Sequence, residues 1–189
     1  DRPIEAFIPM AENLIGPKSY KVDDVIVSGE KAVEITNTDA EGRLLLADAL
    51  QQAAKVKPAA VIDLATLTGA CQVALGSYTA GLFSNEQSLG DELLTAAGQS
   101  AERLWPLPLD RSLRKKLDST VATIKNTAGE RWGGAITAAL FLHEFVEDGT
   151  PWAHLDIAGP AHYSSTWRGI PAGASGYGMA TLVRFLQSG

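Results

Sequence analysis

Short apolar runs alternate with longer helical patterns along most of the chain. Two apolar runs, 25–27 and 32–35, flank Ser28-Gly29-Glu30-Lys31, which predicts a hairpin. Segment 135–146 is apolar on most sides, which predicts a buried helix. The remaining patterns predict strands at 4–8, 59–64, 80–83 and 152–157, and helices at 44–56, 89–99, 111–117 and 179–187.

Strands that alternate with helices predict an α/β fold, with a mixed, mainly parallel sheet flanked by helices. The loops at the strand ends of such a sheet are the expected place for chemistry. Trp105-Pro106-Leu107-Pro108 is a stiff connection, and we expect no domain boundary there because apolar residues continue through it. The chain runs from Asp1 almost directly into the predicted strand 4–8, so we expect it to enter partway through a domain.

The composition of the 189 residues is ordinary for a globular protein, with 46% hydrophobic and 20% charged residues. A formal net charge of -6 argues against a nucleic-acid or anionic-membrane partner, since both select basic surfaces. No apolar run approaches the roughly 20 residues that span a bilayer, and no signal peptide is visible. Cys71 is the single cysteine, which we expect to be buried and reduced. These features together predict a cytoplasmic protein.

The most informative segment is Asn37-Thr38-Asp39-Ala40-Glu41-Gly42-Arg43, between a predicted strand and a predicted helix. Two carboxylates two residues apart on a loop can converge on one divalent cation. Arg43 at a helix N-terminus suits an anion held between its guanidinium and free backbone N–H groups. The alternative is a capping box, with Thr38 as the N-cap and Glu41 reaching back to it. Spacing alone leaves both interpretations open.

A resemblance favours the metal interpretation. NTDAEGRLLLADAL resembles the signature of the leucine (cytosol) aminopeptidase family. AENLIGPKSYKVDDVI, VIDLATLTGA, GERWGGAITAALFL and WAHLDIAGPA resemble the same family in the same order. The resemblance implies a zinc-exopeptidase-like fold and a cytoplasmic, metal-dependent enzyme that removes N-terminal residues, leucine among them, from peptides. It also implies a closed homohexamer with active sites that face an inner cavity.

The resemblance assigns roles to individual residues. Asp39 would bind metal, and Glu41 would bridge two divalent ions of zinc, manganese or magnesium that activate water. Arg43 would hold a bicarbonate-like base, cradled by the backbone N–H groups of Ala40, Gly42 and Leu67. Thr66, Gly69 and Ala174 would line the pocket for the substrate's first side chain. Asn37 and Ala40 would border the pocket beyond the scissile bond, and Leu67 is a further substrate-binding position.

The family places three more metal ligands, a lysine and two aspartates, and a second lysine upstream of this signature. Lys18 and Asp23 have the family's Lys-to-Asp spacing, but the residues around them differ. We therefore expect residues 1–189 to be the C-terminal portion of the catalytic domain, without the N-terminal domain and the upstream ligands. We expect such a chain to be inactive alone, and to have either a companion chain that supplies the upstream segment or an abnormal oligomer that buries the exposed surface. The alternative is a non-catalytic binding or scaffold protein that keeps the fold.

Other polar residues favour structural roles. His154 and Asp156 alternate on a predicted strand and face the same way, which suits hydrogen bonding better than metal binding. His143 lies on the apolar helix, as a core or interface residue. No G-x-S-x-G motif surrounds Ser175, so it is not expected to be a nucleophile. Gly133, before the apolar helix, is expected to permit close packing.

Overall fold

The computed structural model describes residues 3–12 and 16–188. These residues form two compact units. Of the described residues, the sheet unit consists of 62–109 and 151–188, and the hairpin unit of 3–12, 16–61 and 110–150. One boundary falls directly after Leu109, where the sequence predicts none. The apolar residues that continue through the proline-rich segment belong to the sheet unit, so their continuity did not indicate a single compact body.

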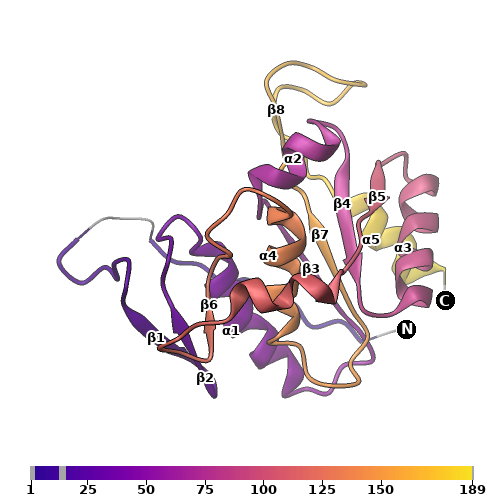
Figure 1. The fold of residues 1–189 in the computed structure, drawn as a ribbon. Coiled ribbons are helices and arrows are strands. Elements are labelled where there is room, and N and C mark those ends of the chain that lie inside the picture. The colour runs from indigo at the N-terminus through magenta and orange to yellow at the C-terminus, as the bar shows by residue number, and fades with distance from the viewer. Residues whose placement is uncertain (1–2, 13–15, 189) are drawn as a thin grey trace. The chain divides into compact units, whose positions relative to one another are not determined.

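The sheet unit contains a four-stranded sheet in the order β3 (Val61–Ala65), β7 (Trp152–Asp156), β4 (Ala80–Ser84) and β5 (Leu104–Pro106). Strand β4 is parallel to β5 and antiparallel to β7, so the sheet is mixed. Helix α3 (Gln87–Gln99) packs against this sheet, and α5 (Met179–Gln187) packs against α3 (Figure 1). Helix α2 (Gly69–Leu75) contacts β4, and β8 (His162–Tyr163) pairs with β9 (Gly173–Ala174).

The core of the sheet unit follows from two sequence patterns. All five residues of β7 are buried, as expected for a strand that is apolar apart from His154 and Asp156. Helix α3 buries Leu89, Leu93 and Ala96, whose spacing places them on one face. The unit therefore packs a helix face against a strand with neighbours on both sides.

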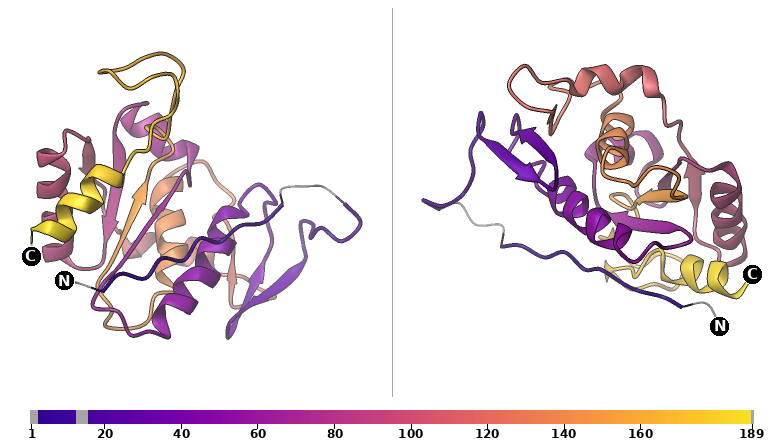
Figure 2. Two further views of the ribbon diagram at one scale, coloured as in Figure 1. Left: turned by 180° about the vertical axis from the view of Figure 1, so that it is seen from behind. Right: turned by 90° about the horizontal axis from the view of Figure 1, so that it is seen from below.

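The hairpin unit is built around β1 (Val25–Ser28) and β2 (Lys31–Glu34), which pair antiparallel, and β6 (Ile124–Lys125), which is parallel to β2. Gly29 turns the hairpin with a φ of 59°, a conformation that favours glycine. Helix α1 (Gly42–Ala54) and the 3-10 helix η1 (Arg111–Leu117) both contact α4 (Gly134–His143). The two further views show α1 running beside the hairpin (Figure 2).

Most predicted elements are confirmed to within a few residues, and two predictions are wrong. Residues 3–12 form no strand, and Ile4 and Ile8 are 68% and 77% exposed, because an apolar run becomes a strand only beside a pairing neighbour. The helix predicted at 111–117 is confirmed with the same bounds, as a 3-10 helix whose first turn is capped by Asp110. Residues Leu104–Pro106 form an edge strand, where a proline is tolerated. Cys71 is buried and unpaired, as expected.

Candidate active site

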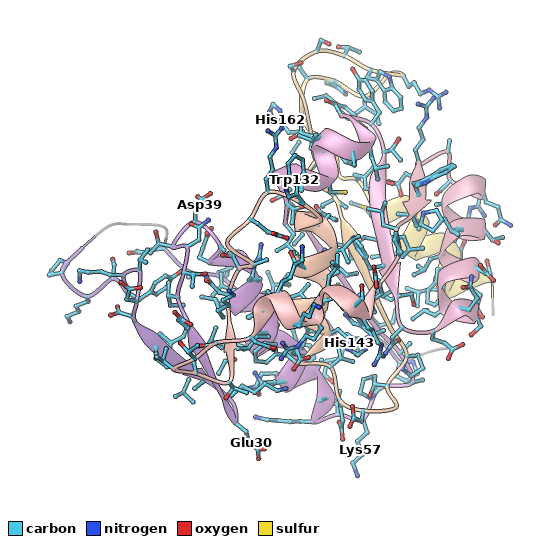
Figure 3. All side chains as sticks on the ribbon, viewed as in Figure 1. Glu30, Asp39, Lys57, Trp132, His143 and His162 are labelled. Atoms are coloured by element: carbon cyan, nitrogen blue, oxygen red, sulfur yellow. The ribbon has the colours of Figure 1, made fainter. Side chains whose placement is uncertain are left out.

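Asp39 and Glu41 lie on the loop between β2 and α1. Helix α1 begins at Gly42 with Glu41 at the N-cap position, and the Glu41 side chain makes no capping hydrogen bond. The capping box of Thr38 and Glu41 is therefore wrong, because the helix begins three residues later than that motif requires. Asp39 is exposed and its side chain points outward from the hairpin unit (Figure 3).

These two carboxylates are available to a ligand. Within 3–12 and 16–188, neither carboxylate takes part in a hydrogen bond or an ion pair with the protein. The Asp39 N–H donates to Asn37 Oδ1 at 2.9 Å, so the backbone turn is held without the Asp39 side chain. Burial, and then the charge of Glu41, raise the pKa of Tyr20, which keeps its phenol protonated near the Glu41 carboxylate. The loop thus presents negative charge that the described protein does not neutralise.

Asn126, which the sequence does not point to, anchors this loop. It is fully buried and directly follows β6. Its Oδ1 accepts from the backbone N–H of Thr36 at 2.8 Å and of Asn37 at 3.3 Å. Its Nδ2 donates to the Asn37 carbonyl at 2.7 Å. One amide side chain therefore fixes the chain at the point where it leaves β2 for Asp39.

Asn126 also holds Arg43. The Arg43 side chain is buried, with 8% of the residue exposed, and its Nη1 donates to the Asn126 carbonyl oxygen at 2.8 Å. Arg43 is the second residue of α1, where backbone N–H groups lack partners within the helix. A fixed guanidinium next to such N–H groups favours an anion. Asn37, Asp39, Ala40, Glu41 and Arg43 are thus brought together at one loop–helix junction of the hairpin unit.

The other predicted site residues belong to the sheet unit. Thr66 and Leu67 lie between β3 and α2, and Gly69 is the first residue of α2. Ala174 lies on β9, opposite His162, and not on this loop. The Leu67 N–H donates to Asp156 Oδ1 at 3.2 Å. This N–H is therefore already engaged, although the resemblance assigns it to an anion cradle.

His154 and Asp156 of β7 have structural hydrogen bonds, as predicted, but among the described residues their partners are others and they do not form a pair. His154 Nδ1 lies 2.5 Å from Asp63 Oδ1, and Trp152 Nε1 donates to Asp63 Oδ2 at 2.7 Å. Asp156 instead accepts from Leu67 and from Thr68. In the described part of the chain, no group of three or more His, Cys, Asp or Glu could hold a metal ion.

The remaining polar candidates also have structural places. Ser175 Oγ donates to the Pro160 carbonyl at 2.5 Å and accepts from the Tyr177 N–H. His143 is half-buried on α4, and burial and then the charge of Arg111 lower its pKa. His162 is exposed on β8 (Figure 3). Across residues 3–12 and 16–188, no helix has both the length and the apolar character to cross a membrane.

The model of the cytosol aminopeptidase family, catalytic domain, matches residues 1–183. The chain belongs to the cytosol aminopeptidase family. It is 49% identical over 189 residues to a probable cytosol aminopeptidase of Aquifex aeolicus, covering 99% of this chain and 38% of that relative. A Synechococcus relative of the same description is 51% identical over 187 residues, covering 98% of this chain and 38% of the relative. The chain therefore spans about two fifths of these relatives' length.

Solved structures agree with this family membership. A tomato leucine aminopeptidase mutant superposes with a TM-score of 0.87 at 44% identity, covering 93% of this chain and 34% of that chain. The bottromycin maturation enzyme BotP in complex with Mn has a TM-score of 0.84 at 41% identity, covering 88% and 38%. The resemblance of NTDAEGRLLLADAL and the mixed α/β fold are thus confirmed. The shares covered also confirm that the catalytic domain is incomplete in this chain.

Proposed function

We propose that this chain supplies Asp39, Glu41 and Arg43 to the active site of a metal-dependent aminopeptidase that releases N-terminal residues, leucine among them, from peptides. The observation that carries the proposal is the loop of the hairpin unit. It presents two carboxylates without hydrogen-bond or ion-pair partners among the described residues, next to a fixed arginine. Membership of the cytosol aminopeptidase family makes peptide hydrolysis the chemistry that such a loop would serve.

The donor set fits divalent cations. Carboxylate oxygens suit zinc, manganese and magnesium, and Asp39 and Glu41 would hold two such ions. Bound divalent ions supply Lewis acidity and lower the pKa of water toward neutrality. Arg43, held by the Asn126 carbonyl at the start of α1, would orient a bicarbonate-like anion as the proton acceptor. Thr66, Leu67, Gly69 and Ala174 would contact the substrate, with Asn37 and Ala40.

Two carboxylates cannot complete a dinuclear site, because each metal normally takes three or more protein ligands or shares bridging ones. The described residues of this chain offer no larger cluster. We propose that the other ligands come from the part of the catalytic domain that the relatives have and this chain does not span. In the assembled enzyme we expect a cytoplasmic homohexamer, with the upstream part either fused or present as a companion chain.

The first experiment compares the 189-residue chain alone with the same chain mixed with the upstream part of the catalytic domain, taken from the Aquifex aeolicus relative. Release of leucine from a leucyl amide is measured with manganese or zinc added. We expect activity only in the mixture. Activity of the lone chain would overturn the proposal that ligands are missing. A folded mixture that neither binds metal nor releases leucine would favour a non-catalytic scaffold instead.

The second experiment tests the carboxylates in the active mixture. Asp39→Asn and Glu41→Gln should each remove most of the bound metal and most of the activity, measured by elemental analysis and by leucine release. The melting temperature should change little, because neither side chain bonds to the described protein. Glu30→Gln is the matched control, an exposed carboxylate at the hairpin turn of the same unit (Figure 3). Full metal content in both site variants would rule out the assignment.

A further inference from the structure

We propose that the buried carboxylate of Asp156 is a positioning residue that shapes the pocket for the substrate's first side chain, by fixing the loop Thr66–Thr68. The inference rests on the proposed function, which gives Thr66, Leu67 and Gly69 their contact with substrate. Asp156 itself does not touch the substrate. It acts through the loop that leaves β3.

The geometry around Asp156 is that of an anchor. Asp156 is the last residue of β7, the strand next to β3, and it is 1% exposed. Its Oδ1 accepts from the N–H groups of Leu67 at 3.2 Å, Thr68 at 3.4 Å and Ala158 at 3.2 Å. Its Oδ2 accepts from the Thr68 hydroxyl at 2.6 Å. A buried carboxylate is tolerated because these donors replace its hydration.

The anchor continues into helix α2. Thr68 is the N-cap of α2, and its Oγ accepts from the Cys71 N–H at 3.0 Å. Gly69, a predicted pocket residue, lies between the two ends of that bond. Asp156, Thr68 and the Cys71 N–H therefore form one chain of hydrogen bonds on either side of Gly69. Hydrogen bonds to a charged group are the stronger kind, so the loop position depends on the Asp156 charge.

The hydrogen bonds of the loop 66–68 are made mainly to Asp156. The Leu67 N–H has a carboxylate as its acceptor and is directed at Asp156, not at an external anion. Thr66 is exposed, and Leu67 is half-buried. Among the described residues, the backbone pairing of this segment ends where the Ile157 N–H donates to the Ala65 carbonyl. Beyond Ala65, the Asp156 carboxylate accepts the backbone N–H hydrogen bonds that a neighbouring strand would otherwise accept.

Cys71 provides a reporter for this anchor. Its thiol is fully buried, with Sγ 3.7 Å from the Asp156 carbonyl oxygen. Burial, and then the charge of Asp156, raise the pKa of Cys71 to about 12, so the thiol is protonated at neutral pH. Alkylation of Cys71 therefore requires the turn held by Thr68 to open. Peptide mass spectrometry reads this one cysteine even if the rest of the enzyme has others.

The experiment uses the active mixture of this chain with the upstream part of the domain. Thr68→Val removes the hydroxyl between Asp156 and Cys71, and Thr68→Ser retains it. Asp156→Asn removes the charge and keeps the shape. Thr95→Val is the matched control, because the Thr95 hydroxyl bonds only to a backbone carbonyl on the exposed face of α3. Each variant is measured for Cys71 alkylation and for kinetics on leucyl and alanyl amides.

For Thr68→Val and Asp156→Asn we expect alkylation about tenfold faster, the change that loss of one charge-assisted hydrogen bond would give. We expect KM for the leucyl amide to rise about fivefold relative to the alanyl amide, with kcat changed less. Thr68→Ser should restore both values, and Thr95→Val should change neither.

Two results would overturn the inference. Unchanged alkylation would show that Asp156 does not hold the turn. Faster alkylation with an unchanged leucyl-to-alanyl ratio would show a structural role without influence on the pocket. If the wild-type mixture releases no leucine, the proposed function is overturned and this inference with it. Leucine release by the wild-type mixture, measured before any variant, distinguishes that outcome.

Discussion

Asn126→Ala should loosen the candidate metal loop. The substitution removes the acceptor for the backbone N–H groups of Thr36 and Asn37 and the donor to the Asn37 carbonyl. The Asn126 carbonyl that holds Arg43 belongs to the backbone and is retained, but its position is no longer fixed by the side chain. We expect a loss of stability together with a loss of leucine release.

The magnitude follows from which groups water can reach. Asn37 is exposed, so water can replace the lost partners of its N–H and its carbonyl. The Thr36 hydroxyl keeps Thr127 Oγ1 as a partner at 2.8 Å. The Thr36 N–H is less accessible, and leaving it unpaired costs about 1–3 kcal/mol. With the small cavity left by the amide, the free energy of unfolding should fall by about 2–4 kcal/mol.

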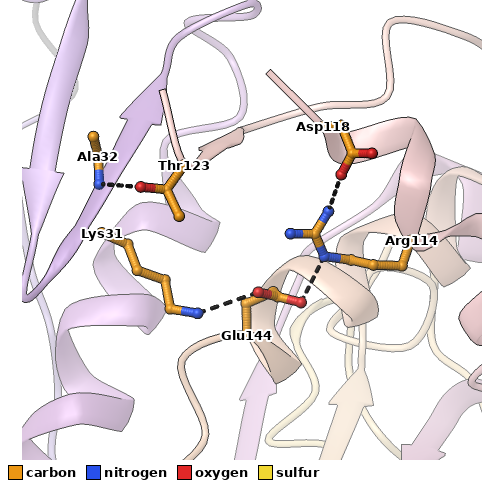
Figure 4. A network of polar contacts seen from close by, with 6 residues as sticks. All are labelled: Lys31, Ala32, Arg114, Asp118, Thr123 and Glu144. Atoms are coloured by element: carbon orange, nitrogen blue, oxygen red, sulfur yellow. Dashed lines mark hydrogen bonds and ion pairs between the residues drawn. The ribbon is translucent and has the colours of Figure 1, made fainter. Parts of the chain in front are cut away.

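The assay is urea unfolding followed by circular dichroism, with leucine release measured in the active mixture. Thr123→Ala is the graded control on the same strand pair, because it removes one exposed acceptor for the Ala32 N–H (Figure 4). It should cost less than about 1 kcal/mol. A loss below about 0.5 kcal/mol for Asn126→Ala, with an unchanged rate, would refute the assignment of Asn126 as the loop's anchor.

Two further predictions concern charged residues of the hairpin unit. Arg43→Ala should lower the turnover of the active mixture without removing its metal, and added bicarbonate should partly restore the turnover. Loss of metal, or an unchanged rate, would contradict an anion-binding role. Glu144→Gln should cost about 1–2 kcal/mol at neutral pH in urea unfolding, because Glu144 accepts from Arg114 at 2.5 Å and Lys31 at 3.2 Å (Figure 4). Burial raises the pKa of Glu144, but these hydrogen bonds outweigh it and lower the pKa below the ordinary 4.5. The stabilisation is therefore present above pH 4.5 and is lost as the pH falls through the lowered pKa. The free energies of unfolding of wild type and variant should converge in acid. A difference that persists there would contradict the stabilising role of Glu144.

The sequence was sufficient for elements whose signal is local. The hairpin around Gly29 was predicted from its turn residues, and α4 from its apolar character on most sides. The prediction of a strand at 4–8 was wrong because one apolar run does not show whether a neighbouring strand is present to pair with it. The boundary between the two units after Leu109 was not predicted, for a related reason. The sequence shows which residues are apolar but not the unit in which each is buried.

The candidate site likewise contains residues that a local motif indicates and residues that it does not. Asp39, Glu41 and Arg43 lie within five residues and could be found from a motif. The residues that hold them could not be found, because each bond joins positions far apart in sequence. Asn126 is 90 residues from Thr36, and Asp156 is 89 residues from Leu67. Asn126 lies in a segment with no motif of its own, and Asp156 was expected only to form a structural hydrogen bond.

Asn126 and Asp156 solve one problem in the same way. A loop that leaves a strand for a binding site loses the backbone partners that the sheet provides, and its N–H groups then need another acceptor. In each unit the acceptor is a buried side chain at the end of the neighbouring strand, after β6 for the loop following β2 and on β7 for the loop following β3. Among the described residues, the two carboxylates proposed to bind metal therefore make no structural hydrogen bonds or ion pairs of their own. Substitutions of Asp39 or Glu41 should therefore change function with little change in stability, whereas substitutions of Asn126 or Asp156 should change both together.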